Sequence, residues 1–219
     1  MKTAMKILLA TTAFGLVPAL GMAQDWSGPY GGLTFGYAIG NANHSFDNGA
    51  PSDNSSPDGL LIGGFVGYGF QSGNMVYGGE IDADLNNVAG SFINTTGATS
   101  GGTTEGVWQA SVRGVVGVAG QLGNKPALYY ATAGWATGQF DFMGGPSASP
   151  ISAYSDTLNG WTAGVGVDWR VNPVATVRLE YRYTDFGTAS GVLAPAFPGV
   201  TMPVDVTQSE IRLGVRIDF

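Results

Sequence analysis

The sequence predicts an all-β fold: an eight-stranded, antiparallel, up-and-down transmembrane β-barrel, closed, with short periplasmic turns and four longer extracellular loops. Apolar and polar residues alternate with a period of two in segment after segment, which is typical of strands with one apolar and one polar face. The connections between these segments are alternately short and long. Beyond residue 23, no apolar run approaches the roughly 20 residues that a membrane-spanning helix needs. Strands that enter a bilayer must pair all their backbone groups, so they must close into a ring.

The first 23 residues have the layout of a secretory signal peptide. Lys2 and Lys6 precede the apolar stretch 7–20, and the small residues Gly21 and Ala23 lie where a signal peptidase cuts. We expect cleavage after Ala23. Residues 1–23 would then be removed, and residues 24–219 would form a single β-barrel domain of 219 − 23 = 196 residues.

The predicted mature chain is acidic and contains no cysteine. Without Lys2 and Lys6 it keeps 9 − 2 = 7 basic residues against 16 acidic ones, a net charge of 7 − 16 = −9. Because phosphate contacts need lysine and arginine, this composition argues against nucleic-acid binding. Without cysteine there is no disulfide framework, so stability must come from packing and backbone hydrogen bonds.

The alternation defines eight strands, four of which carry it clearly. From Val177 to Tyr183 the odd positions are apolar or aromatic and the even ones are charged or polar. From Ile211 to Phe219 the odd positions are apolar throughout. The same pattern is clear in 77–85 and 161–169 and weaker in the others. In chain order, the predicted strands are 30–41, 59–70, 77–85, 105–121, 127–142, 161–169, 177–183 and 211–219.

Three short and four long connections join these strands. The short ones are Gln71–Asn74, Gln121–Pro126 and Val171–Val174, with 4, 6 and 4 residues. The long ones are Ala42–Asp58, Val88–Thr104, Met143–Asp156 and Thr188–Thr207, with 17, 17, 14 and 20 residues. This rhythm is typical of outer-membrane barrels whose two chain ends lie on the periplasmic side. Every proline after the signal falls in a turn or loop, or at a strand start, so none is expected to interrupt a strand.

Aromatic residues near the strand ends predict girdles at the two membrane interfaces. The candidates are Trp26, Tyr30, Tyr68, Tyr77, Trp161, Trp169 and Phe186. A soluble β-sandwich would also show alternation. The export signal, the rhythm of the connections and these aromatics favour the membrane barrel.

The polar faces of the strands predict a charged barrel interior. An eight-stranded barrel has room inside only for its own side chains. Acids and arginines in near balance should pair with one another and form a structural network. The alternative is a charged pathway or a cation site. The predicted network residues are Glu80, Asp82, Asp84, Arg113, Asp168, Arg170, Arg178, Glu180, Arg182, Glu210, Arg212, Arg216 and Asp218.

Two groups of carboxylates are weaker candidates for divalent cations. Glu80, Asp82 and Asp84 share one strand face, and hard cations take carboxylate oxygens, but the arginines compete for the same groups. Asp47, Asp53 and Asp58 lie in the first long connection, where divalent ions could bridge them to lipopolysaccharide. The simpler interpretation of that segment is a solvated loop. We expect no bound metal and no cofactor.

The sequence offers no convincing catalytic group. The only histidine, His44, is followed by Ser45, but adjacent residues on a strand point to opposite faces and do not form a dyad. One histidine without cysteine cannot make an ordinary zinc site. The glycines Gly114, Gly117 and Gly120 predict tight packing of the barrel wall. We therefore expect a protein that is not an enzyme.

Four stretches carry a resemblance to a known family: Trp26–Gly32, Gly160–Gly166, Arg178–Tyr183 and Arg216–Phe219. Together they resemble the small outer-membrane β-barrels, the opacity-protein-like and porin-family surface antigens of Gram-negative bacteria. The resemblance extends over essentially the whole chain after the signal. It implies a multi-strand integral protein of the outer membrane. It also implies that Val215, Ile217 and Phe219 are the assembly signal for the barrel assembly machinery, which acts with periplasmic chaperones.

The expected function follows from this resemblance and from the loops rich in Ser, Thr, Asn, Gly and Pro. We expect a monomeric surface protein that contacts outer-membrane lipid and lipopolysaccharide, supports membrane integrity and displays its loops. The alternative is a narrow porin-like channel for small solutes. A third hypothesis is a loop-mediated adhesin or ligand binder.

Overall fold

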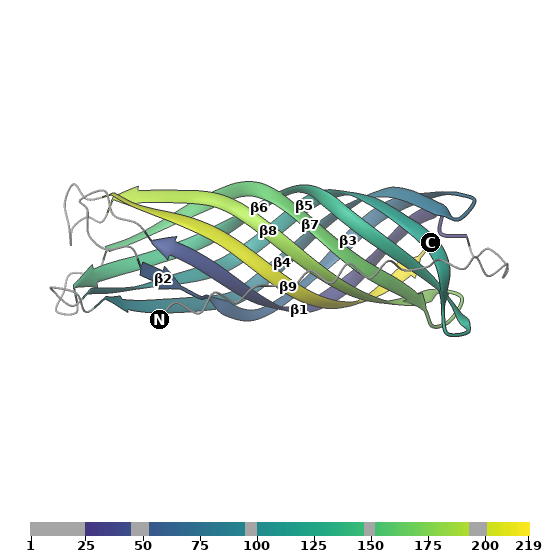
Figure 1. Cartoon of the computed structure of the whole chain (residues 1–219), viewed down its shortest axis with the longest axis horizontal. Coiled ribbons are helices and arrows are strands. Elements are labelled where there is room, and N and C mark those ends of the chain that lie inside the picture. The colour runs from purple at the N-terminus through teal and green to yellow at the C-terminus, as the bar shows by residue number, and fades with distance from the viewer. Residues whose placement is uncertain (1–24, 45–52, 95–99, 147–151, 193–200) are drawn as a thin grey trace, which may run out of the picture.

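Nine strands form one closed antiparallel sheet in the computed structural model, which describes residues 25–44, 53–94, 100–146, 152–192 and 201–219 (Figure 1). The predicted signal peptide lies outside these residues. The strands wind around the long axis in sequence order, and β9 pairs with β1 to close the ring. No helix long and apolar enough to cross a bilayer occurs in the described part of the chain. The strands are β1 (Gly28–His44), β2 (Asp53–Ser55), β3 (Asp58–Ser72), β4 (Met75–Asn94), β5 (Ser100–Leu122), β6 (Lys125–Pro146), β7 (Ser152–Arg170), β8 (Ala175–Val192) and β9 (Thr201–Asp218).

The eight long strands confirm the predicted barrel, and β2 is an addition to it. This three-residue strand pairs with Ala42–His44 at the end of β1, in the place where β3 would otherwise continue. Pro57 lies between β2 and β3 and has no N–H for the ladder. Its carbonyl accepts a hydrogen bond from the Gly40 amide at 2.7 Å. The proline thus splits one wall strand into two.

The predicted strands were too short at the extracellular end. β4 runs to Asn94 instead of Leu85, β6 runs to Pro146, and β9 begins at Thr201 instead of Ile211. Much of the predicted loops Val88–Thr104 and Thr188–Thr207 is therefore barrel wall. The prediction for proline was also wrong at this end, because Pro203 is the third residue of β9 and pairs with Ser190.

Two of the periplasmic turns are tighter than predicted. Ser72 pairs with Met75, and Leu122 pairs with Lys125, so each loop has two residues, a glycine followed by an asparagine. Gly73 and Gly123 have φ of 63° and 64°, which glycine adopts without strain and which two-residue hairpins require. The third turn spans Val171–Val174, as predicted.

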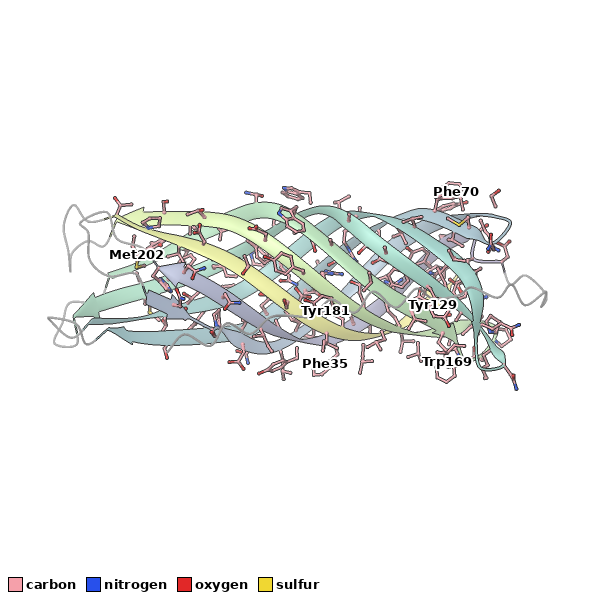
Figure 2. The ribbon with its side chains drawn as sticks, in the orientation of Figure 1. Phe35, Phe70, Tyr129, Trp169, Tyr181 and Met202 are labelled. Atoms are coloured by element: carbon pink, nitrogen blue, oxygen red, sulfur yellow. The ribbon has the colours of Figure 1, made fainter. Side chains whose placement is uncertain are left out.

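The outer face of the barrel carries an apolar belt. On β7 the outward residues from Trp161 to Trp169 are apolar, while the inward ones include Thr162 and Asp168. Large apolar side chains project from the wall all round, including Phe35, Tyr129 and Tyr181 (Figure 2). This is the pattern of a wall that faces lipid outside and a polar interior inside.

Above the belt the polarity of the wall reverses although the strands continue. On β7 Leu158 points inward and is buried, while Thr157 and Asn159 point outward. On β9 Val204 and Val206 are buried inside, with Asp205 exposed between them. We call this extracellular part of the wall the collar; it comprises residues 41–44, 86–94, 100–106, 136–146, 152–160, 186–192 and 201–209. Its apolar interior and polar exterior are those of a water-soluble barrel.

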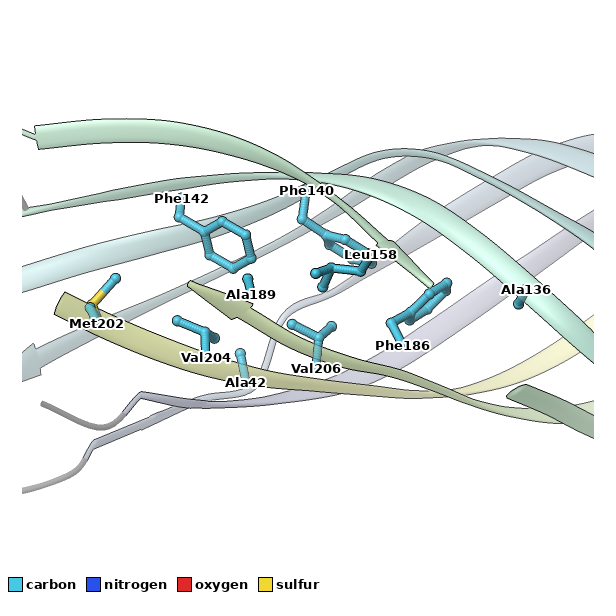
Figure 3. Close-up of a cluster of buried hydrophobic side chains, with 10 residues drawn as sticks. All are labelled: Ala42, Ala136, Phe140, Phe142, Leu158, Phe186, Ala189, Met202, Val204 and Val206. Atoms are coloured by element: carbon cyan, nitrogen blue, oxygen red, sulfur yellow. The ribbon is translucent and has the colours of Figure 1, made fainter. Parts of the chain in front are cut away.

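A packed apolar cluster fills the collar (Figure 3). Phe140 meets Phe186 edge to face, with ring centroids 5.0 Å apart, and Phe142 stacks on Tyr154, also at 5.0 Å. Phe186 continues the inward face of Arg182 and Thr184, and a β-bulge between Asp185 and Gly187, where Gly187 has φ of 78°, shifts the alternation so that Ala189 is also buried. The buried members are Ala42, Ala136, Phe140, Phe142, Leu158, Phe186, Ala189, Met202, Val204 and Val206.

Four of the seven predicted girdle aromatics face outward: Tyr68, Tyr77, Trp161 and Trp169. The prediction was wrong for Trp26, Tyr30 and Phe186, all of which are buried inside the barrel. Phe186 lies on the same inward face of β8 as Arg182 and Thr184. Trp26 and Tyr30 instead contact arginines of the interior, which a one-dimensional pattern cannot reveal.

Candidate functional site in the barrel interior

The structure places all thirteen predicted network residues on the inward face of the wall. Twelve of them are at most 7% exposed, and the side chain of Asp218, at the periplasmic rim, is 23% exposed. Alternation along β4, β8 and β9 brings them together, because every second residue of a strand points inward. They form three tiers along the barrel axis.

The central tier is a compact set of two arginines and three acids. Arg182 lies 2.9 Å from both Asp82 and Glu180. Arg113 lies 2.9 Å from Glu180 and 3.1 Å from Asp82, and it also pairs with Glu80. β4, β5 and β8 supply these residues, so the pairs tie opposite sides of the barrel together.

The upper tier is built around Arg212. Its guanidinium binds Asp84 at 2.6 Å and Glu210 at 2.9 Å. Gln109 donates to Glu210 at 2.8 Å, and Gln208 donates to the same carboxylate at 2.8 Å. Sequence reasoning missed both glutamines, although each lies at an inward position of its strand.

Arg178 connects the central tier to the periplasmic tier. It lies 2.7 Å from Glu80 and 2.8 Å from Asp168. Its guanidinium carbon also lies 4.2 Å from the centre of the Phe65 ring and 5.0 Å from that of Tyr130, within the range of cation–π contacts.

The periplasmic tier closes the network at the rim. Arg216 lies 3.0 Å from Asp168 and 2.8 Å from Asp218, and Arg170 lies 2.6 Å from Asp218. Tyr30 is covered by Arg216, whose guanidinium carbon is 3.7 Å from the ring centre. The tyrosine predicted for the lipid interface thus contributes to the interior instead.

Two gaps bordered by network residues are very small. A gap bordered by Glu80, Arg113 and Glu180 has no room for a water molecule. A second gap, between Arg182 and Phe186, has about 10 Å³, roughly the room that one water needs. Each buried ion is therefore neutralised by direct contact and not by solvent, and removing one partner would leave an uncompensated charge.

The three carboxylates of β4 proposed as cation ligands are occupied by arginines. Glu80, Asp82 and Asp84 are each bound to at least one arginine. In the first long connection, Asp47 lies outside the described residues, and Asp58 accepts a hydrogen bond from Tyr37 on the outer face. Within the described part of the chain, no group of three or more His, Asp or Glu side chains is placed to hold a metal ion.

His44 contacts Ser55, a serine that the sequence analysis did not predict as its partner. Its Nε2 lies 3.1 Å from the Ser55 hydroxyl of β2, whereas Ser45 lies outside the described residues. Both His44 and Ser55 are 1% exposed. A nucleophile must reach its substrate, and this pair is enclosed, so the geometry does not support catalysis.

Of the three glycines that we expected at tight contacts, Gly117 alone lies at one. A Cβ on Gly117 would come within 2.8 Å of both Leu128 and the Tyr129 carbonyl. A Cβ on Gly114 or Gly120 would approach nothing closer than 3.8 Å or 3.5 Å, which is ordinary contact. The packing explanation therefore holds for Gly117 and is wrong for the other two.

The residues predicted as an assembly signal lie at the closing seam of the barrel. Val215 and Ile217 are paired with Leu33 and Gly31 of β1, and their side chains are exposed on the outer face. The Phe219 amide donates to the Pro29 carbonyl at 3.0 Å, and its ring is 82% exposed.

Comparison with known proteins gives matches over most of the chain. A family model described as "Outer membrane protein beta-barrel domain" matches residues 7–219. The 31 kDa outer-membrane immunogenic protein of Brucella melitensis is 34% identical over 176 residues, covering 74% of this chain and 72% of that protein. The 25 kDa outer-membrane immunogenic protein of Brucella abortus is 30% identical over 195 residues, covering 89% and 80%.

Among solved structures, the outer membrane protein OprG from Pseudomonas aeruginosa matches with a TM-score of 0.53. The match covers 88% of this chain and 97% of that one, at 13% identity. At this identity the likeness concerns the fold alone.

Proposed function

Because this chain belongs to the outer membrane protein β-barrel domain family, we propose that it is a non-conducting structural barrel of the outer membrane. Its place in the outer membrane is shared with its relatives, which are named outer-membrane proteins. In this role it stabilises the membrane as a rigid, monomeric wall element, carries the collar and loops outward, and performs no catalysis.

The filled interior carries this proposal. Acids and arginines from opposite sides of the barrel are joined by direct contacts of 2.6–3.1 Å, and the two gaps that they border have room for no more than about one water molecule. Above them, the apolar cluster of the collar adds a second barrier to ions. A conducting pore would instead need a wetted lumen, usually with one sign of charge in excess.

Conductance of the purified, refolded protein in a planar bilayer tests the proposal. The fraction folded is measured first, from the shift in gel mobility between unheated and boiled samples. We expect a heat-modifiable protein that gives no steady openings. Stable, ion-selective openings that change in Arg182→Ala would contradict the proposal and support the narrow porin-like channel.

The proposed partners are the lipids and the assembly machinery of the outer membrane. The apolar belt supports contact with acyl chains, and the collar would lie at the level of lipopolysaccharide. The exposed side chains of Val215, Ile217 and Phe219 are available for recognition by the barrel assembly machinery. We expect Phe219→Ala to lower the amount of protein inserted in cells, with less effect on stability after refolding in vitro. An unchanged inserted amount would contradict this assignment.

Display of the loops is a second candidate function, favoured by the collar. The collar holds the strand ends beyond the apolar belt, and the Brucella relatives are named immunogenic. We propose that antibodies against the folded protein bind intact cells mainly through this end. Replacing residues 95–99 with the two-residue turn Asn-Gly tests this without removing wall strands, whereas deletion of Val88–Thr104 would cut into β4 and β5. Binding that is unchanged after this and equivalent loop replacements would contradict display.

A further inference from the structure

The segment before β1 turns into the periplasmic mouth of the barrel. Asp25–Ser27 is outside the strand ladder, which begins with the pair Gly28 and Gly69. Gly28 has φ of 114°, a conformation that other residues rarely adopt, and it redirects the chain from the wall towards the lumen. Trp26 is consequently 1% exposed.

Trp26 contacts residues from four separate strands. Its indole packs in one cluster with Val76 of β4 and Leu128 of β6. The guanidinium carbons of Arg170 on β7 and Arg216 on β9 lie 4.4 Å and 5.3 Å from the ring centre. These strands surround a common site only after β9 has paired with β1, so the site for the indole exists only in the closed ring.

A few local hydrogen bonds hold the segment in place. The Trp26 amide donates to the Gln71 side-chain oxygen at 2.8 Å, and the Gln71 amide donates to the Ser27 hydroxyl oxygen at 3.0 Å. The Ser27 amide donates to Asp25 at 2.8 Å. Hydrogen bonds from the Ser27 hydroxyl and amide keep the pKa of the exposed Asp25 carboxyl below its usual value. None of these bonds belongs to the barrel ladder.

The docked position leaves hydrogen-bonding groups unsatisfied. Trp26 Nε1, Arg170 Nε and the Thr176 hydroxyl are buried, and the described residues give them no partner. Thr176 pairs with both Arg170 and Arg216, the two arginines that touch the indole. The segment itself is held by a packed indole and a few local hydrogen bonds instead of a strand ladder, so it should release more easily than the wall unfolds.

From this geometry we propose that Asp25–Gly28 is a latch. Its tryptophan docks into the periplasmic mouth after the ring closes, and it can release while the barrel stays folded. The latch touches only the periplasmic tier, and the central and upper tiers lie beyond it, so its release does not depend on whether the barrel conducts. It also explains the motif that opens the domain: Trp26 fills the mouth, Gly28 turns the chain, and Tyr30 supports Arg216.

Gly69 allows the latch to be undocked without changing the indole or its arginines. A Cβ on Gly69 would lie 2.6 Å from the Trp26 carbonyl oxygen and no closer than 3.7 Å to other atoms of the latch or wall. The control is Gly79→Ala, in the neighbouring strand, where the nearest atom lies 3.9 Å from the added Cβ. Trp26→Ala is the second test variant, used also if Gly69→Ala does not fold.

A cysteine placed behind the latch reports its state, since the chain contains no cysteine. Thr176→Cys puts a thiol at a position that is 0% exposed, and Thr162→Cys puts one deeper in the lumen, at 1%. The folded barrel is treated with a water-soluble maleimide. We expect Thr176→Cys to label faster than Thr162→Cys. Adding Gly69→Ala or Trp26→Ala should accelerate only the Thr176→Cys reaction, by about tenfold or more, while Gly79→Ala should change neither.

Two outcomes would overturn the proposal. If both cysteines label at the same slow rate, the mouth opens only when the whole barrel unfolds. If Gly69→Ala and Trp26→Ala both leave the Thr176→Cys rate unchanged in heat-modifiable protein, the latch does not close the mouth. Either result can occur whether or not the barrel conducts, so it does not depend on the proposed structural role.

Discussion

A positive charge moved along β7 would locate the edge of the membrane. Val165 and Thr157 are both exposed, outward-facing residues of the same strand. With about 3.4 Å per residue and a tilt near 40°, each residue advances about 2.6 Å along the barrel axis. Val165 lies four residues from both Trp161 and Trp169, about 10 Å from either tryptophan and near the middle of an apolar belt roughly 25 Å tall. Thr157 lies eight residues further up the strand, about 8 Å beyond the belt.

The expected costs follow from these positions. Val165→Arg places a guanidinium near the middle of the bilayer and should lower the free energy of unfolding by about 2–4 kcal/mol. Thr157→Arg leaves its charge in water and should change the free energy by less than about 1 kcal/mol. For Leu158, which is buried in the collar, substitution by arginine should cost more than about 3 kcal/mol.

Urea unfolding in lipid vesicles, followed by the heat-dependent gel shift, measures all three variants. The same titration in detergent micelles is the control. Vesicles and micelles both surround the barrel with an apolar layer, but the thickness of that layer differs. Equal costs for Val165→Arg and Thr157→Arg would refute the reasoning. The outer surface would then be a single environment, and the reversal of polarity would not mark the membrane edge.

Three further predictions concern the interior and the wall. Arg182→Met leaves two buried carboxylates short of a partner and should cost about 3–5 kcal/mol. Arg170→Met should cost about 1 kcal/mol or less, because its partner Asp218 is partly exposed at the rim and keeps Arg216; equal costs in urea unfolding would contradict this. Phe140→Ala should cost about 3–5 kcal/mol by opening a cavity in the collar, and a loss below about 1 kcal/mol would mean that the cluster is not packed. Gly160→Ala brings a Cβ to 1.7 Å from the Asp185 carbonyl oxygen and should reduce the heat-modifiable yield, whereas Gly114→Ala should fold normally; equal yields would show that the wall can shift.

Much of the fold could be predicted from the sequence because alternation and connection length are local properties. The inward face of β8 is evident from Arg178, Glu180 and Arg182, which recur at every second position. Which acid pairs with which arginine could not be predicted. Arg178 bridges Glu80 and Asp168, and the strand register that brings these two acids to it is set by the closed ring.

The collar was missed for a different reason. The inward positions of β9 stay even-numbered from Met202 to Arg212, but their chemistry changes from apolar to polar between Val206 and Gln208. A search for alternation finds both stretches. It does not test whether the apolar residues have moved from the outward to the inward positions of the strand. That switch was visible in the sequence. The burial of Trp26 could not be predicted, because it depends on a turn before the first strand.

This change from apolar to polar outward positions also makes the hydrophobic thickness of the barrel independent of the length of its strands. The hydrophobic thickness of the barrel depends on the residue at which the outward positions stop being apolar, and not on where the strands end. Because outward residues are two positions apart, changing one outward residue on each strand would alter that thickness by about 5 Å at constant strand length. Mismatch with the surrounding bilayer costs fractions of a kcal/mol per Å, so such exchanges would adapt the protein to thinner or thicker membranes. The collar would then keep its core, and the loops would keep their anchor points.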